Sequence, residues 1–189
     1  MNFFQAIILG IVQALTEYLP VSSSAHIRII GDLMLGADPG AAFTAIIQIG
    51  TELAVILYFR RDIINILSHW FGCLFGKNGP DWRARMGRGD KYATLGWNVI
   101  VGSIPIIILG FTLQNIIETS LRNLWITVTV LFLFGLLLWI VDARSRQIKT
   151  MDDMNYRDAF LFGLGQSMAL IPGVSRSGGT ITVGRALGY

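Results

Sequence analysis

Three long apolar runs limit the folds open to this chain. Residues 93–113 and 124–141 contain no charged side chain, and residues 41–59 contain only Glu52. A helix needs about 20 mostly apolar residues to cross a bilayer, and within lipid the backbone must satisfy its own hydrogen bonds. The sequence therefore predicts an all-α, polytopic membrane protein. Residues 1–189 would form a single integral membrane domain, and the three runs would be its spans.

The composition agrees with a membrane location and narrows the partners. Charged residues make up 14% of the chain, against about 25% in soluble domains, and the mean hydropathy is +0.58. The net charge of +3 is small, and the basic residues gather in loops, where they indicate topology rather than a nucleic-acid surface. We expect membrane lipid and no nucleic acid as partners. The single Cys73 excludes an intramolecular disulfide.

The N-terminal apolar region is interrupted by polar residues. Residues 3–19 include Gln13 and Glu17, Pro20 ends the run, and three serines precede a second apolar piece at 27–35. An ionisable side chain at the bilayer centre costs roughly 2.5–3.5 kcal/mol on insertion scales, so its presence suggests function. Helix, polar break and helix form the pattern of a re-entrant hairpin that lines a cavity within the protein.

The same polar pattern returns 153 positions later. Residues 10–24 align without a gap with residues 163–177, and the identical pairs are Gly10 and Gly163, Gln13 and Gln166, Val21 and Val174, Ser22 and Ser175, and Ser24 and Ser177. Arg176 stands where the first copy has Ser23, and His26 has no counterpart. Two similar turns that carry different side chains indicate one composite site.

Loop charges place the two turns on opposite sides of the membrane. The loops at 77–91 and 142–157 are rich in lysine and arginine and so face inside, whereas the connection at 114–123 has one arginine and faces outside. The sequence thus predicts two inverted repeats, each with a re-entrant hairpin. Repeat one covers about 1–120, and residues of about 121–189 form only the start of repeat two. Since the chain stops soon after the second motif, we expect its C-terminal helices to be missing.

The second turn has the residue types that bind phosphate. Ser175, Arg176, Ser177 and Thr180 accompany two glycines at a predicted helix start. A helix N-terminus offers free N–H groups to an anion, and arginine presents a planar pair of donors to phosphate oxygens. The alternative to phosphate binding is a helix break that only packs closely, but a buried arginine needs an anionic partner.

The first turn has residue types suited to catalysis. Ser23 and His26 are three apart, so on a helix they can face each other as a nucleophile and its base. Water activated directly by His26 is an equal alternative. Serine capping of a helix that begins near Ile27 is the structural alternative, with Ser22 or Ser24 as the cap.

Oxygen ligands near these residues suit a divalent cation. Gln13 and Glu17 lie four apart on one helical face, where they can hold Mg²⁺ or Ca²⁺ against diphosphate oxygens. A packing role for Glu17 is about as common. Gln48 and Glu52 are also four apart, and they either face the same cavity or pack against a neighbouring helix. No Walker-type glycine loop is present, so a diphosphate at membrane depth implies a lipid-borne phosphate.

Two motifs are specific enough to indicate a family. The chain reads LTEYLPVSSSAH at 15–26 and PGVSRSGGT at 172–180, with QIG at 48–50, two arginines at 60–61 and DDMNYR at 152–157. Together these closely resemble the bacterial undecaprenyl-diphosphate phosphatase family, also called bacitracin-resistance proteins. The resemblance implies a multi-pass protein of the bacterial plasma membrane that removes the terminal phosphate of undecaprenyl diphosphate. This reaction regenerates the lipid carrier for peptidoglycan synthesis.

The resemblance also implies roles for the site residues. Ser23 looks like the nucleophile, and His26 looks like its acid/base partner. Glu17 looks like a ligand of Mg²⁺ or Ca²⁺ or an acid/base group, and Arg176 looks like the diphosphate clamp. The phosphate pocket would be lined by Ser22, Ser24, Ser175, Ser177 and Thr180.

The chain departs from the family pattern at one chemically important position. The family commonly has two glutamates four apart, and the first of them is Gln13 here. A neutral amide can ligate a metal through its oxygen, but it cannot accept a proton. Either Glu17 alone suffices, or Glu52 compensates, or metal binding is weak.

A lipid-carrier flippase is the non-enzymatic alternative. Inverted repeats with broken helices are typical of transporters, and the same residues would then bind the phosphate without cleaving it. A serine–histidine pair favours chemistry, because binding alone needs no base. A homodimer is left open.

Overall fold

The described part of the chain is helical throughout. The structure, a computed structural model, describes residues 1–119 and 124–189, apart from the side chains of residues 41 and 114–119, and no strand occurs within them. In chain order the elements are α1 (Phe3–Glu17), α2 (Ser23–Leu35), α3 (Ala41–Tyr58), α4 (Arg60–Leu74), α5 (Trp82–Arg85), α6 (Lys91–Thr119), α7 (Leu124–Arg144), η1 (Met151–Asp153), α8 (Tyr156–Ser167), η2 (Met168–Leu170) and α9 (Arg176–Leu187). The predicted all-α class is confirmed.

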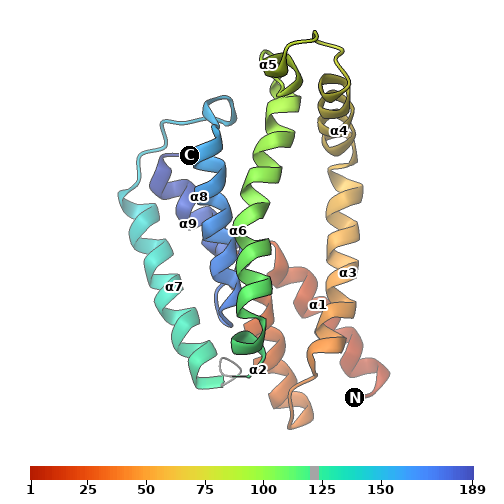
Figure 1. Ribbon diagram of the computed structural model, residues 1–189. Helices are drawn as coiled ribbons and strands as arrows, with labels where there is room; N and C mark the ends of the chain where they lie inside the picture. Colours follow the sequence, from red (N-terminus) through yellow and green to blue (C-terminus); the bar gives the residue numbers. More distant parts are fainter. Residues whose placement is uncertain (120–123) are drawn as a thin grey trace.

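Two helices are long and apolar enough to cross a membrane by themselves. These are α7 over its whole length and α6 over Lys91–Leu113. Helices α3 and α4 meet the same criterion only together, and the pair is bent by 72°. Figure 1 shows the two helices one after the other along one side of the molecule. The predicted span at 41–59 is therefore one arm of a bent pair, which is either a broken span or a re-entrant segment.

Each polar turn joins two helices that pack together. The first pair is α1 and α2, and the second is α8 and α9, with η2 between them. Helix α8 also packs on α6, and α9 packs on α7, so the second pair lies between these two long helices (Figure 1). Ser175 caps α9, because its Oγ accepts a hydrogen bond from the Gly178 N–H at 3.2 Å.

Three element ends differ from the predicted ones. Helix α2 begins at Ser23 rather than near Ile27. Helix α6 continues to Thr119 and so covers most of the predicted connection at 114–123, while residues 120–123 lie outside the described part. Helix α7 ends at Arg144, beyond the predicted span. In each case polar residues extend a helix past its apolar stretch, since helical hydrogen bonds satisfy the backbone in lipid and in water alike.

Glycines allow α6 and α8 to approach closely. A Cβ atom at Gly163 would collide with the carbonyl oxygen of Gly102, whereas one at Gly10, the matching position of the first copy, would meet nothing within 4 Å. Small residues at such crossings let helix backbones pack in membranes. We expect Gly163→Ala to lower stability by about 1–3 kcal/mol, as overpacking does. Gly10→Ala, the matched control, should be neutral or slightly stabilising.

Thermal unfolding of the two glycine variants in detergent measures this difference. A fall in the melting temperature for Gly163→Ala alone agrees with the packing described above. Equal melting temperatures for the two variants would contradict a close α6–α8 contact.

Candidate active site

The turns of the two helix pairs meet. Ser177 Oγ donates a hydrogen bond to the carbonyl oxygen of Leu19 at 3.1 Å, and Arg176 forms an ion pair with Glu17. The two polar turns, which the repeat predicted to form one composite site, therefore lie side by side in the structure.

Glu17, the last residue of α1, is at the centre of this contact. Its side chain is only 12% exposed. Oε1 accepts a hydrogen bond from Nη2 of Arg176. Oε2 accepts one from Ser23 Oγ at 2.5 Å and one from Gln13 Nε2 at 2.8 Å. Three donors fix the orientation of this carboxylate, and one of them is a hydroxyl whose proton Glu17 is placed to accept.

Arg176, the first residue of α9, is shared between two carboxylates. Nη2 binds Glu17, and Nη1 lies 3.3 Å from Oε1 of Glu52 on α3. The interpretation that Glu52 faces the site agrees with this contact. Tyr18 adds a second link to α3, because its hydroxyl donates to the Thr51 carbonyl oxygen at 2.7 Å.

A cavity of about 250 Å³ opens between the two turns and α3. Its described lining residues are Glu17, Ser22, Ser23, Ser24, Gln48, Ala169, Val174, Ser175 and Arg176. Hydroxyls, an amide, a carboxylate and a guanidinium thus share one small space. Such a set of groups can bind phosphate oxygens through several donors and leaves a carboxylate beside a hydroxyl for proton transfer.

The predicted pairing of Ser23 with His26 is not found. Ser23 Oγ is bonded to Glu17 instead, and His26 Nδ1 lies 2.9 Å from the carbonyl oxygen of Ser22. A carbonyl only accepts, so Nδ1 is the donor in this contact. His26 lines a different cavity, of about 280 Å³, beside residues of α7. Ser23 and His26 both lie on α2, but His26 bonds to Ser22, in the turn that precedes this helix.

The backbone of the first turn is strained at Ser22. Ser22 has φ +61°, the only positive φ of a non-glycine residue in the part of the chain that the structure describes, and it is 1% exposed. Such strain costs about 1–3 kcal/mol and gathers at functional sites. The His26 hydrogen bond to the Ser22 carbonyl helps to hold this conformation, and it places Ser23 at the start of α2.

The remaining predicted hydroxyls divide into two groups. Ser22, Ser24 and Ser175 line the cavity. The described lining does not include Ser177 or Thr180, because Ser177 Oγ bonds to Leu19 and Thr180 Oγ1 donates to the Arg176 carbonyl oxygen at 2.8 Å. These two hydroxyls satisfy backbone groups instead.

The oxygen ligands for a divalent cation are few. Within the described residues, no group of three or more His, Cys, Asp or Glu side chains could hold a metal ion. Gln13 is 1% exposed, and its Oε1 has no hydrogen-bond partner among these residues, so it is an orphaned acceptor next to Glu17. One carboxylate and one amide oxygen fit a cation that is held mainly by phosphate oxygens, which is how Mg²⁺ commonly binds. They do not form a cage of protein ligands.

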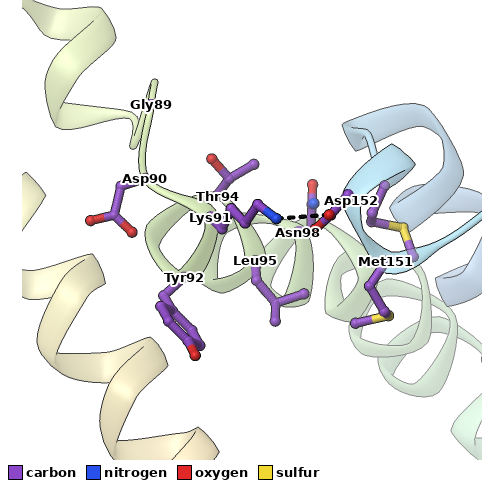
Figure 2. Close-up of a pocket in the computed structure, with 10 residues that line it drawn as sticks. Gly89, Asp90, Lys91, Tyr92, Thr94, Leu95, Asn98, Met151 and Asp152 are labelled. Carbon is purple, nitrogen blue, oxygen red and sulfur yellow. Dashed lines mark hydrogen bonds and ion pairs between the residues drawn. The ribbon is translucent and has the colours of Figure 1, made fainter.

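Figure 2 shows a larger cavity of about 500 Å³, at the start of α6 and beside η1. Lys91 and Asp152 form an ion pair there at 2.7 Å, and Asp90 pairs with His69 at 2.7 Å. None of the predicted site residues line it. Its charged groups bind one another, and we do not assign it to the active site.

Sequence reasoning missed two features of the site. The Glu17–Ser23 hydrogen bond joins residues six apart across a turn, a spacing that no regular helix brings together. The division of Arg176 between Glu17 and Glu52 depends on the tertiary contact of three helices. The interruption of the apolar run 41–59 by Gln48 and Glu52 was the available signal, and it indicated the correct helix.

Comparison with known proteins supports a family assignment. Residues 6–189 match the family model described as Bacitracin resistance protein BacA. The chain is 89% identical over 189 residues to an undecaprenyl-diphosphatase of Bifidobacterium longum subsp. infantis, and 71% identical to one of Bifidobacterium adolescentis. In both cases the match covers 100% of this chain and 64% of the relative.

A more distant relative gives the same result. An undecaprenyl-diphosphatase of Micrococcus luteus is 54% identical over 190 residues, which cover 100% of this chain and 66% of the relative. The chain thus spans about two thirds of the length of the curated relatives that it matches. On the family-model match and these identities, the chain belongs to the bacitracin resistance protein BacA family.

Proposed function

We propose that this site is the catalytic centre of an undecaprenyl-diphosphate phosphatase. The enzyme would hydrolyse the lipid diphosphate to undecaprenyl phosphate and inorganic phosphate, and so recycle the carrier for peptidoglycan synthesis and give bacitracin resistance. The name shared by the relatives supports this proposal. The observation that carries it is the hydrogen bond between Ser23 and Glu17, next to Arg176.

In the first step Ser23 acts as the nucleophile. Glu17 Oε2 accepts the hydroxyl proton across the 2.5 Å hydrogen bond while Oγ forms a bond to the terminal phosphorus. The bond from that phosphorus to the bridging oxygen breaks, and undecaprenyl phosphate leaves. Arg176 neutralises the negative charge on the equatorial oxygens of the transferring phosphoryl group. Stabilisation of this charge supplies most of the catalysis in phosphoryl transfer.

In the second step a water oxygen bonds to the phosphorus, the bond from phosphorus to Ser23 Oγ breaks, and Glu17 returns its proton to Oγ. Inorganic phosphate leaves with the protons of the water, and Glu17 is again a carboxylate. His26 holds the Ser22 carbonyl and thereby fixes the turn that presents Ser23. We therefore assign the role of proton acceptor from Ser23 to Glu17, and a positioning role to His26.

The hydroxyls of the cavity would bind the diphosphate oxygens. Ser22 and Ser24 supply donors from the first turn, and Ser175 supplies one from the second. A divalent cation, Mg²⁺ or Ca²⁺, would be held by the diphosphate together with Glu17 and Gln13 Oε1, and would supply further neutralisation of charge.

Replacing Gln13 with glutamate tests this cation site. A second buried carboxylate next to Glu17 repels it without metal and binds a cation more tightly than an amide does. We expect Gln13→Glu to lower the melting temperature in chelator and to bind Mg²⁺ about tenfold more tightly by calorimetry, a change worth about 1.4 kcal/mol. Gln5→Glu, the same change near the start of α1, is the control. If Mg²⁺ stabilises parent and Gln13→Glu equally, Gln13 is not a ligand.

The membrane arrangement that we propose follows the loop charges. The protein would be a multi-pass protein of the bacterial plasma membrane, with α1–α2 and α8–α9 as re-entrant hairpins from opposite faces in two inverted repeats. The meeting of the two turns supports this arrangement. A homodimer stays a prediction.

Phosphate release from a polyprenyl diphosphate tests the proposed function. The full-length protein would be purified in detergent and assayed with magnesium and with chelator. We expect metal-dependent release of inorganic phosphate. Binding of the lipid without release would contradict the phosphatase and favour the flippase, although a flippase has no use for a carboxylate bonded to a serine hydroxyl.

A further inference from the structure

The two carboxylates that bind Arg176 differ in how firmly they are held. Glu17 is 12% exposed and has two further donors, Ser23 and Gln13. Glu52 is 60% exposed, and the structure records no other hydrogen bond or ion pair for it in the described residues. Its distance to Nη1 is 3.3 Å and it has no second donor, so this is the weaker of the two pairs.

We propose that Glu52 is a displaceable partner of Arg176, which holds the guanidinium in the empty site and gives way to the terminal phosphate of the substrate. Glu52 would then compete with phosphate for Arg176, weaken substrate binding and speed the release of inorganic phosphate. The inference deepens the proposed phosphatase function and rests on it.

Two of the five N–H donors of Arg176 are bound to carboxylates, one on Nη1 and one on Nη2, so a phosphate that binds through these groups competes with one carboxylate. A bidentate contact with phosphate uses two N–H groups of the guanidinium fork. Displacing Glu17 would leave a largely buried carboxylate without its cation and would disturb the Ser23 hydrogen bond. Displacing Glu52 breaks no other hydrogen bond or ion pair among the described residues. The terminal phosphate therefore takes the Nη1 side of Arg176.

The charge of the cluster leads to the same conclusion. One arginine faces two glutamates, which gives the group a formal charge of −1 before any substrate arrives. A diphosphate approaching this group meets net repulsion as long as Glu52 stays in place. Movement of Glu52 away from Arg176 leaves Arg176 and Glu17 as a neutral pair, and the return of Glu52 favours departure of the phosphate.

The position of Glu52 suits a group at the mouth of the site. Gln48, one helical turn before it on α3, lines the 250 Å³ cavity, whereas Glu52 does not. Glu52 thus reaches Arg176 from the rim. A purely structural strut between α3 and the turns is the competing explanation. Tyr18 already forms such a link through the carbonyl oxygen of Thr51, the residue before Glu52.

Binding of a non-hydrolysable diphosphate separates these explanations. Methylenediphosphonate would be titrated by calorimetry into the full-length protein in detergent at fixed magnesium. We expect Glu52→Gln to bind it about two- to fivefold more tightly than the parent, the effect of losing one weak ion-pair partner. Asp62→Asn, which neutralises an exposed carboxylate at the start of α4, controls for general charge and should bind like the parent. The Glu52→Gln change should have no effect in an Arg176→Ala background.

Steady-state kinetics give an independent readout. We expect Glu52→Gln to lower KM for the lipid diphosphate and to strengthen product inhibition by inorganic phosphate by the same factor, with no gain in kcat. Weaker or unchanged methylenediphosphonate binding by Glu52→Gln would overturn the inference, as would a tightening that persists without Arg176. If the parent releases no phosphate but Glu52→Gln still binds the analogue more tightly, the phosphatase function fails while the competition for Arg176 stands.

Discussion

Arg176→Ala is expected to reduce kcat/KM for phosphate release by about a thousandfold or more. Arg176 is the only arginine in the described lining of the site cavity, and its guanidinium bridges the two hairpin turns. An arginine that neutralises a transferring phosphoryl group contributes about 10³–10⁵ in rate. Its loss also leaves Glu17 without the cation that offsets its charge, so both substrate binding and the orientation of the base suffer.

Conservative variants separate geometry from charge. Arg176→Lys keeps the positive charge but loses the planar fork, and we expect it to lose about 10–100-fold, because a point charge cannot bind two oxygens in fixed geometry. Arg185→Lys is the matched control, since Arg185 lies on the same helix and pairs with Asp142 at 2.6 Å, away from the cavity. The initial rate of phosphate release from a polyprenyl diphosphate measures all three variants. Full activity of Arg176→Lys would show that only charge is needed.

Much of the architecture could be predicted because membrane folding places strong limits on sequence. Runs without charge indicated α6 and α7, and polar residues between apolar pieces indicated both helix pairs. The charged residues Arg60 and Arg61 marked the end of the predicted span at 41–59, but the 72° bend into α4 could not be predicted, because only tertiary packing sets its angle. The extension of α6 to Thr119 was missed because a helix satisfies its backbone in either solvent.

The site was predictable in part of its membership and not in its bonding. The repeat placed Arg176 opposite the first turn, and the structure brings the two together. The partner of Ser23 was predicted wrongly, because spacing on a helix favours residues three or four apart, and Pro20 and the strained Ser22 bring Glu17 closer than any helix would. Thr180 bonds to the carbonyl four residues before it, as threonine commonly does within helices, whereas Ser177 bonds to Leu19 in the other turn, a contact that only the tertiary structure creates.

Ser23→Ala and Glu17→Gln are expected to be equally damaging and not additive. If the two residues act as one unit, removing either ends the same proton transfer, and a second change has nothing further to remove. We expect each single variant to lose about 10³–10⁴ in kcat, and the double variant to lose about the same. Glu17→Gln preserves the volume of the side chain, so its effect reports on charge and proton acceptance rather than on packing. The steady-state rate of phosphate release at saturating lipid measures kcat for the set.

Double variants that include His26→Ala decide which residue serves as the base. If Glu17 accepts the proton, the coupling between Ser23→Ala and Glu17→Gln is nearly complete. His26→Ala, which loosens the turn, should cost less than Glu17→Gln in the parent, and because it acts through the position of Ser23 it should not reduce the residual rate of Glu17→Gln further. If instead His26→Ala has no added effect in Ser23→Ala while Glu17→Gln does, histidine is the base and the hydrogen bond between Glu17 and Ser23 only orients the hydroxyl. The structure favours the first result, because Ser23 Oγ lies 2.5 Å from Glu17 Oε2 whereas His26 is bonded to a backbone carbonyl.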